Sequence, residues 1–254
     1  MKKKENDPLK AARDRLAFFQ EMGADFVLGR GKKPPVPSGS TSEAMGTAER
    51  VPAPEPRVTA APASALTPQV SFAELEKKVL SCRLCPLSSS RTQAVPGEGD
   101  KKAELMFVGE APGRDEDAAG RPFVGRAGQL LTKIIEAMTW KREEVYITNV
   151  VKCRPPDNRT PLPAEVEKCS PYLVRQIELI RPRVIVTLGK VATDFFIPGR
   201  MSMTERRGKF VVHQGIRIMP TFHPSYVIRN EGNKDIKKMV WKDMQLVMEF
   251  LGKK

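Results

Sequence analysis

LMFVGEAPGRDED, residues Leu105–Asp117, is the stretch that decides the fold of this 254-residue chain. Its first four residues are apolar, and a run of that length bounded by Gly and Pro is typical of a buried strand. Gly109, Pro112 and Gly113 then predict a tight loop at the carboxyl end of the strand. In an open parallel sheet, ligands bind at the carboxyl ends of the strands. Glu110 is therefore either a catalytic or ligand-positioning acid or a solvated turn residue.

Strand and helix signals alternate from this point to the C-terminus, which predicts βαβ units and an α/β fold with a parallel sheet. The expected strands are 105–109, 145–151 and 183–188, followed by a hairpin of 209–213 and 216–220 whose second arm completes the sheet. The expected helices are 71–81, 127–138, 163–180, 190–196 and 233–251. The first of them opens with a capping box of Ser71 and Glu74.

The first 70 residues differ in composition from the rest. Apolar residues recur every three or four positions over 10–29, which is typical of an amphipathic helix, and we assign this helix to residues 1–31. Residues 32–70 are rich in Pro, Ala, Ser and Thr and hold no aromatic residue, so we expect a disordered linker. The helix is then either a docking helix for a protein partner or a weakly ordered tail. Residues 71–254 are the expected folded domain, and its activity on naked substrate should survive deletion of residues 1–70.

The chain carries a net charge of +13, and most of the surplus lies in the expected domain. Residues 1–70 hold 11 basic and 8 acidic side chains, which leaves 32 and 22 for the remainder. This surplus favours a polyanionic partner such as nucleic acid, although a merely basic protein has the same composition. No apolar run reaches the ~20 residues that span a bilayer, and no signal-peptide segment follows the N-terminus. We therefore expect a cytoplasmic protein with no membrane partner.

The four cysteines are Cys82, Cys85, Cys153 and Cys169. In a reducing cytosol, thiols favour metal binding or catalysis over disulfides. Cys82 and Cys85 form a CxxC pair, which is a good metal signal. Cys169 also lies on the apolar stripe of its predicted helix, where a free Cys is often a small buried hydrophobe. Together the four predict a closed site of four thiolates, which zinc and a [4Fe-4S] cluster both accept; the spacing does not choose between them.

Three further residues follow predicted strands at the same edge of the sheet. Phe123 stands in a Gly/Pro-rich loop, where it is either a core residue or a stacking plate in a base-binding pocket. Asn149 lies near the end of the second predicted strand, where its amide either caps the strand or offers a donor and an acceptor to a base edge. His223 opens a His-Pro-Ser turn that can present its imidazole to a ligand and push an apolar pair outward.

Four segments, together with the four cysteines, closely resemble the family 4 uracil-DNA glycosylases, which are the iron–sulfur members of their superfamily. The segments are GEAPGRDED (Gly109–Asp117), GRPFVGRAGQLL (Gly120–Leu131), TNVVKCRPPDNRTP (Thr148–Pro161) and HPSYVIR (His223–Arg229). The resemblance covers about residues 80–251 and does not extend to the first 70. It implies a three-layer α/β/α sandwich around a four-stranded parallel sheet, with a structural [4Fe-4S] cluster held by the four cysteines.

The resemblance also implies a monofunctional enzyme that hydrolyses the N-glycosidic bond of uracil in single- or double-stranded DNA. The uracil is flipped out of the helix and an abasic site is left, which initiates base excision repair. Glu110 would orient a water at the anomeric carbon, and His223 would donate a hydrogen bond to uracil O2. Phe123 would stack on the base and Asn149 would read its Watson–Crick edge. The implied uracil pocket consists of Gly109, Ala111, Gly113, Phe123, Asn149 and His223.

The segment after His223 is implied as the DNA-binding loop. Its residues are Pro224, Ser225, Tyr226, Val227, Ile228 and Arg229. We expect this loop to enter the minor groove, with Val227 or Ile228 filling the space left by the flipped base. The candidates for phosphate contact are Lys152, Arg154, Arg159, Lys190, Arg206 and Arg229.

The expected partner is uracil-containing DNA, bound by a monomer. Two other classes of function remain open. One is a non-enzymatic uracil- or single-stranded-DNA-binding protein on the same fold. The other is an iron–sulfur scaffold that acts as a partner adaptor through its N-terminal helix.

Overall fold

The computed structural model describes residues 70–253. The helix expected at 10–29 and the linker expected at 32–70 therefore lie outside the described residues, apart from residue 70 itself. Within the described part, no helix is both long and apolar enough to cross a membrane.

A six-stranded sheet in the order β1-β3-β2-β4-β6-β5 forms the centre of the fold. Its strands are β1 (Glu98–Gly99), β2 (Leu105–Gly109), β3 (Tyr146–Asn149), β4 (Val184–Leu188), β5 (Val211–His213) and β6 (Ile216–Thr221). The four central strands run parallel to their neighbours, and the two edge strands are antiparallel. The expected four-stranded parallel sheet is thus confirmed as the centre of a mixed sheet. β1 has no counterpart among the predicted strands, because a two-residue strand has no periodicity to detect.

Helices surround this sheet. The α-helices are α2 (Phe72–Leu80), α3 (Leu87–Ser90), α4 (Arg114–Ala119), α5 (Arg126–Ala137), α6 (Pro163–Ile180), α7 (Lys190–Phe196), α8 (Met203–Arg206), α9 (Pro224–Arg229) and α10 (Lys234–Leu251). Two 3₁₀ turns, η1 (Arg142–Glu144) and η2 (Pro156–Asn158), complete the elements. The capping box of Ser71 and Glu74 that begins α2 is present, with both reciprocal hydrogen bonds formed.

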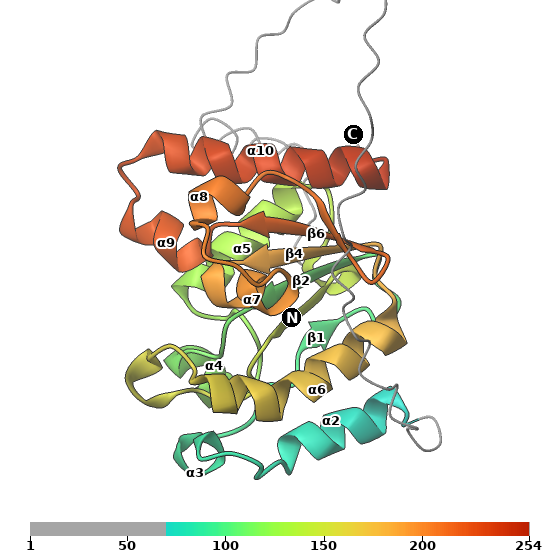
Figure 1. Cartoon of the computed structure of the whole chain (residues 1–254), viewed down its shortest axis with the longest axis vertical. Coiled ribbons are helices and arrows are strands. Elements are labelled where there is room, and N and C mark those ends of the chain that lie inside the picture. Colours follow the sequence, from blue (N-terminus) through green and yellow to red (C-terminus); the bar gives the residue numbers. More distant parts are fainter. Residues whose placement is uncertain (1–69, 254) are drawn as a thin grey trace, which may run out of the picture. The chain divides into compact units, whose positions relative to one another are not determined.

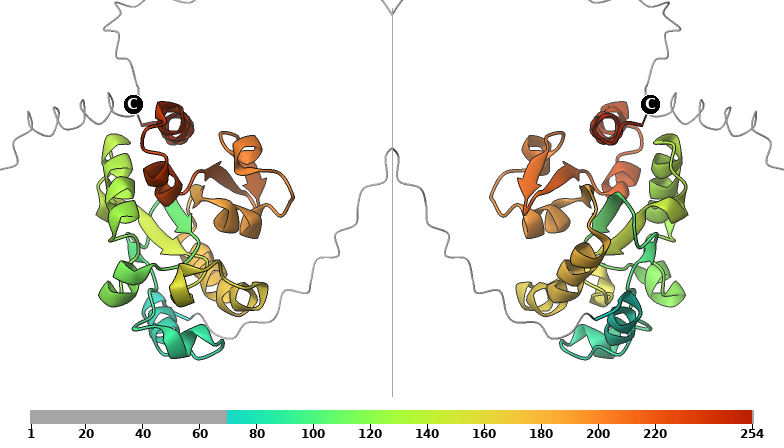
Figure 2. Two further views of the ribbon diagram at one scale, coloured as in Figure 1. Left: turned by 90° about the vertical axis from the view of Figure 1, so that its left-hand side faces the viewer. Right: turned by 90° about the vertical axis from the view of Figure 1, so that its right-hand side faces the viewer.

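Alternate residues of the central strands point to opposite faces, so each face of the sheet has its own core. Phe107 of β2 and Val186 of β4 pack with residues of α5 and α10. Met106 and Ile185 of the same strands pack with α6 and α7 on the other face. Figure 1 shows the resulting layers, with α10 on one side of the sheet and α6 and α2 on the other, and the side views of Figure 2 show α5 and α6 on opposite sides. The expected α/β/α sandwich is confirmed.

Two local expectations need correction. The second predicted strand was placed at 145–151, but β3 ends at Asn149 because the chain bends from Val150 onward. The loop expected after His223 is instead the short helix α9, which packs against α5. Pro224 occupies the first turn of α9 and needs no backbone hydrogen bond there, and His223 accepts the N–H of Ser225 as N-cap.

Candidate functional site

A cavity of about 680 Å³ opens where the loops that follow the parallel strands meet. Its volume lies within the roughly 300–1,000 Å³ typical of small-molecule sites. Glu110 follows β2, Asn149 ends β3, Gly189 follows β4 and His223 lies two residues beyond β6, and all four line this cavity. Of the predicted uracil pocket, Ala111, Gly113, Phe123, Asn149 and His223 line it, together with the predicted catalytic Glu110, and Gly109 does not.

Asn149 lies at the base of this cavity with an unsatisfied acceptor. Its side chain is 1% exposed, and its Oδ1 atom has no hydrogen-bond partner among the described residues. A buried carboxamide oxygen without a partner costs about 1–3 kcal/mol, so such atoms are rare in native folds. A ligand with an N–H group at this position would satisfy the oxygen. The site is therefore complementary to a hydrogen-bond donor.

Gly109, the last residue of β2, lies against Asn149 and Phe123. A Cβ atom at Gly109 would stand 2.4 Å from Asn149 Oδ1 and 2.6 Å from Cζ of Phe123. Real Cβ atoms do not approach other heavy atoms this closely. Only glycine at position 109 lets the amide and the ring approach each other at the end of the strand.

Phe123 presents its ring to the cavity from a strained loop. Its φ angle is +52°, in the left-handed region that non-glycine residues rarely adopt. Its backbone lies so close to α5 that a Cβ atom at Gly128 would be 1.8 Å from the Phe123 carbonyl oxygen. The ring centroids of Phe123 and His223 are 5.7 Å apart with the planes tilted by 33°. The two rings thus border the same part of the cavity.

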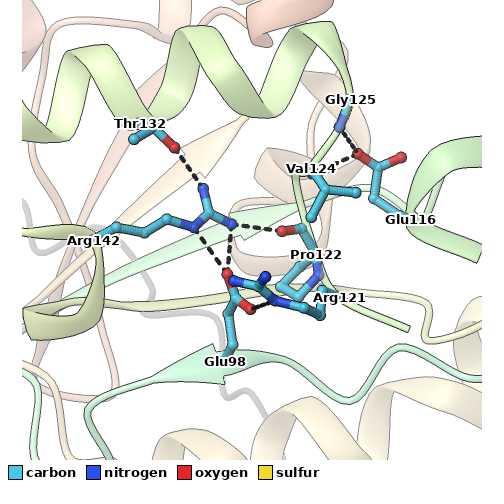
Figure 3. Close-up of polar contacts among 8 residues, drawn as sticks. All are labelled: Glu98, Glu116, Arg121, Pro122, Val124, Gly125, Thr132 and Arg142. Carbon is cyan, nitrogen blue, oxygen red and sulfur yellow. Dashed lines mark hydrogen bonds and ion pairs between the residues drawn. The ribbon is translucent and has the colours of Figure 1, made fainter. Parts of the chain in front are cut away.

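Two acidic side chains hold this loop in place (Figure 3). The Glu116 carboxylate accepts hydrogen bonds from the backbone N–H groups of Val124 and Gly125 at 2.9 and 3.0 Å. Glu98 pairs with Arg142, whose Nη2 also donates to the Pro122 carbonyl at 2.6 Å. These bonds fix the backbone on both sides of Phe123. They offset the cost of its unusual φ angle.

The tautomer of His223 follows from its partners. The Ser225 backbone N–H donates to Nδ1 at 3.1 Å, so Nδ1 carries no proton and the proton of the neutral ring lies on Nε2. Burial, together with the smaller effect of the nearby charge of Arg229, lowers the pKa of His223 to about 4. His223 is therefore a neutral hydrogen-bond donor at physiological pH.

Glu110 is the acid of the cavity. Burial raises the pKa of the Glu110 carboxyl above its usual value, and a hydrogen bond with Thr160 partly opposes this rise. Its backbone carbonyl accepts the N–H of Val151 at 3.0 Å, next to the bond from Val150 to Gly109. The carboxyl group thus stands on a fixed backbone. In this partly dry site its carboxylate form suits a base or a water-positioning role.

The residues of α9 divide between the cavity and the core. Ser225, Tyr226 and Arg229 line the cavity. Val227 is 2% exposed and packs in the core beside α5 and α10, so its expected role as an outward wedge is wrong for this conformation. Ile228 is half-buried and remains available for that role.

Two expected phosphate contacts are also wrong. Lys152 is 1% exposed, and its Nζ donates to groups inside the fold. Arg206 is 4% exposed and pairs with Asp194 and the Ile197 carbonyl. Neither cation reaches the surface. Among the other candidates, Arg159 and Lys190 are exposed but form ion pairs with Glu165 and Asp194, so the charge that they present to a partner is reduced.

All four cysteines line one pocket, which lies between α2, the bend after β3, and α6. Cys153 Sγ accepts a hydrogen bond from Arg91, and Cys169 Sγ accepts one from the backbone N–H of Lys152. No three His, Cys, Asp or Glu side chains within residues 70–253 are arranged so that they could hold a single metal ion. The donor set of the pocket is four thiols from three segments of the chain.

Several residues of the site had no signal in the sequence analysis. Met203 and Thr204 of α8 line the cavity, although no motif surrounds them. Glu116 also lines it, and the spacing of three residues from Gly113 to Glu116 was the available sign of a capping bond. The pair of Glu98 and Arg142 joins positions 44 residues apart, so no local pattern reports it.

Comparison with known proteins places these features in a family. The model of the uracil DNA glycosylase superfamily matches residues 96–245. A type-4 uracil-DNA glycosylase of Thermotoga maritima is 47% identical over 181 residues, which are 70% of this chain and 94% of that protein. The type-4 enzyme of Archaeoglobus fulgidus is 46% identical over 187 residues, 66% of this chain and 92% of the relative.

A type-5 uracil-DNA glycosylase of Pyrobaculum aerophilum is more distant. It is 31% identical over 206 residues, 68% of this chain and 91% of that protein. The identity to the two type-4 relatives is higher. The chain belongs to the uracil-DNA glycosylase superfamily and, within it, to the type-4 uracil-DNA glycosylases.

Proposed function

We propose that this protein is a DNA repair enzyme that hydrolyses the N-glycosidic bond of uracil in DNA and leaves an abasic site. The observation that carries this proposal is the buried, unpartnered Oδ1 of Asn149 beside the ring of Phe123. Uracil presents an N3–H donor that this oxygen can accept. Cytosine has an acceptor at N3, so it would leave the oxygen unpaired and add repulsion.

The cavity accepts a base only after it has left the DNA stack. A flipped uracil would lie on the Phe123 ring, which is held by its loop before the substrate arrives. Because the ring is already in position, little conformational entropy is lost on binding. Ala111 and Gly113 would form the wall of the pocket around the base, and Gly109 would lie behind Asn149 and Phe123.

His223 would stabilise the leaving group. As the glycosidic bond breaks, negative charge gathers on uracil, and the Nε2–H of the neutral ring would donate to O2. A single donor aimed at developing charge in a water-poor site contributes roughly 3–4 kcal/mol to catalysis. The bonds from Ser225 to Nδ1 support this role because they fix the tautomer and the ring orientation.

Glu110 would act on the sugar side. Its ionised carboxylate would hold a water at the anomeric carbon and help to balance the positive charge of the sugar. The water adds to the anomeric carbon, the bonding electrons leave with uracil, and the released proton passes to the carboxylate or to solvent. The fixed backbone of Glu110 supports a positioning role.

The four cysteines would hold a [4Fe-4S] cluster. A zinc site needs all four sulfurs about 2.3 Å from one ion, whereas a cluster binds one thiolate at each of four iron atoms. The four thiols share one pocket, and they supply the four thiolates that such a cluster needs. When bound, the cluster would supply structural cross-links between the segments that carry its ligands, and glycosidic hydrolysis needs no electron transfer.

Helix α9 would contact the DNA around the flipped nucleotide. Ile228 would fill the space left in the stack, and Arg229 would contact a phosphate at the mouth of the cavity. Pro224 and Val227 would support the helix from its buried side, and Ser225 and Tyr226 would face the substrate. We place the protein in the cytoplasm, where thiols stay reduced, and expect it to act as a monomer.

The test is glycosylase turnover on a labelled oligonucleotide with one uracil opposite guanine, followed by alkaline cleavage. Thymine- and cytosine-containing oligonucleotides are the substrate controls. We expect multiple-turnover cleavage at uracil alone, and a loss of about 10²-fold or more in both Asn149→Ala and His223→Ala. Binding of uracil DNA without cleavage, by folded protein that contains iron, would instead support a non-enzymatic binding protein.

A further inference from the structure

Lys152 is a buried cation that the proposed reaction does not use. It lies three residues beyond the end of β3 and immediately before Cys153. Its Nζ is within hydrogen-bond distance of three oxygens: Oγ1 of Thr148 at 2.6 Å, the carbonyl of Asn149 at 2.7 Å and Oε1 of Gln176 at 2.7 Å. None of these is a carboxylate. A buried amino group that donates three bonds to neutral acceptors has a specific structural task.

The acceptors around Nζ are themselves fixed. The Thr148 hydroxyl and the Gln176 Nε2 both donate to the Pro96 carbonyl, at 2.9 and 2.7 Å. Thr148 can therefore accept from Lys152 while its own proton is used elsewhere. Gln176 is fully buried on α6 and also donates to the Tyr146 hydroxyl. The Lys152 ammonium is thus surrounded by three oxygen acceptors, and the Thr148 and Gln176 side chains that supply two of them are held by their own hydrogen bonds.

The bond from Lys152 to Asn149 acts on the peptide that orients the amide of Asn149. The carbonyl of Asn149 accepts from Lys152, and the N–H on the other side of the same peptide, at Val150, donates to Gly109 at 2.9 Å. Both polar groups of the peptide are held, so the backbone from which the Asn149 side chain projects is fixed. Lys152 itself does not line the cavity, and it acts on a ligand there only through Asn149.

Lys152 also borders the pocket of the four cysteines. Its backbone N–H donates to Cys169 Sγ at 3.2 Å, and the residue is part of the lining of that pocket. One residue therefore contacts both the thiol pocket and the residue at the base of the cavity. Five consecutive positions, 149–153, connect the two sites.

We propose that Lys152 is a positioning residue for uracil recognition, which holds the amide of Asn149 in its reading orientation from the thiol side of the sheet. The proposal rests on the proposed glycosylase function. A lysine with a purely structural role would lower stability when removed, and its effect on rate would be independent of Asn149. A positioning role requires that removing Lys152 lowers the rate less when the Asn149 side chain has already been removed.

The test is a double-mutant cycle of Lys152→Met and Asn149→Ala in the iron-loaded protein. Methionine keeps the length of the side chain and removes all three donors. Single-turnover rates and kcat/KM are measured on the uracil oligonucleotide, with iron and sulfide content determined for each protein. We expect Lys152→Met to lower kcat/KM by about 10²-fold, since a displacement of about 1 Å in a positioned group has effects of this size. In the Asn149→Ala background we expect less than about a threefold further change.

Arg91→Met is the matched control. Arg91 also borders the thiols, because it donates to Cys153 Sγ at 2.8 Å and to the Cys82 carbonyl at 2.9 Å, but it does not line the cavity. Per iron-loaded protein, Arg91→Met should change kcat/KM by the same factor in the wild-type background and in the Asn149→Ala background. If Lys152→Met does not fold, Gln176→Met replaces it in the cycle, since it removes one partner of Nζ and should show the same dependence on Asn149.

The outcomes separate the two proposals. If the wild-type protein does not cleave uracil DNA, the glycosylase proposal fails, and this inference fails with it. If the wild type is active but the Lys152→Met and Asn149→Ala effects multiply independently, the inference alone is overturned. Non-additive effects together with an additive Arg91 control support it.

Discussion

At the scale of single residues, recognition depends on contacts that leave no room for change. Asn149 keeps an acceptor free on a backbone that Lys152 holds, and His223 keeps a donor free on a ring that Ser225 holds. Gly109 lies against the amide of Asn149 and the ring of Phe123. The site is preorganised because these residues are already held in place by the protein before a base enters.

Gly109→Ala should therefore disable the pocket. The new methyl group would overlap Asn149 Oδ1 and the Phe123 ring, which must move to accept it. We expect about 1–3 kcal/mol lower stability and at least a 10²-fold loss of kcat/KM, measured by thermal melting and uracil excision. Gly199→Ala is the control, because nothing lies within 4 Å of a Cβ atom there. Equal activity of the two variants would contradict the packing argument.

The lowered pKa of His223 makes a prediction about acid stability. Its pKa is about 4 in the folded protein, against 6.5 for an ordinary histidine, because burial disfavours the charged ring. Between these values the unfolded chain binds a proton that the folded protein does not. The free energy of unfolding therefore has its full value above about pH 6.5 and falls as the pH is lowered toward 4.

His223→Gln should reduce the slope of the free energy of unfolding against pH by up to about 1.4 kcal/mol per pH unit between about pH 4 and 6.5. Urea unfolding between pH 4 and 7 measures it. The wild-type excision rate should show no inflection near pH 6.5, since the ring stays neutral throughout. An unchanged slope in the variant would show that the His223 pKa is not lowered in the folded protein.

At the scale of elements, the loop of Phe123 depends on partners outside it. β1 and η1 supply Glu98 and Arg142, and α4 supplies Glu116, so three elements hold one strained segment (Figure 3). α9 supplies His223 as its N-cap and is itself anchored by the buried Val227. Short helices and the edge strand β1 thus support the loops that line the cavity, and the long helices α6 and α10 cover the sheet.

Arg142→Met should loosen the Phe123 loop without touching the cavity. It removes the bond to the Pro122 carbonyl and leaves Glu98 with fewer partners. We expect a loss of about 1–3 kcal/mol in stability and a rise of about tenfold in KM, because the stacking ring is no longer held before binding.

Arg183→Met is the control for this prediction. Arg183 also forms an ion pair, with Glu104, but both side chains are about half exposed, and such pairs contribute little. Its KM should stay within about twofold of the wild-type value. If the KM of Arg142→Met also stays within about twofold of the wild-type value, the Phe123 loop does not depend on the ion pair of Arg142 and Glu98.

At the scale of the whole described molecule, two sites lie on different parts of one sheet. The cavity occupies the carboxyl edge of the parallel strands, and the four thiols bring together the segment after α2, the bend after β3 and helix α6. A group that binds all four would cross-link the N-terminal helices to the sheet. Metal binding of this kind contributes directly to folding stability.

Cys85→Ser and Cys169→Ser should each lose iron and lower the melting temperature. A loss of about 3 kcal/mol corresponds to roughly 10 °C for a protein of this size. Iron and sulfide analysis and calorimetry measure the two effects. Ser170→Ala, next to Cys169 on α6, should keep both iron content and melting temperature. Full iron content in either cysteine variant would contradict the assignment of four ligands.

The sequence by itself determined the alternation of the main strands and helices, the parallel centre of the sheet and the edge at which the site lies. Apolar runs such as Leu105–Val108 and the stripe of α6 are local signals, and the capping box at Ser71 is read within four residues. The motif residues Glu110, Asn149 and His223 each follow a strand closely, so the topology alone brings them together.

Only the tertiary structure decided the environment of each side chain. Lys152 and Arg206 look like surface cations in the sequence, yet each lies inside a cage of acceptors from distant segments. Val227 was expected to point outward and is instead buried beside α5 and α10, because a helix at that position turns it inward. Burial and hydrogen bonding depend on residues far apart in the chain, such as Lys152 and Gln176, and no local pattern encodes their contact.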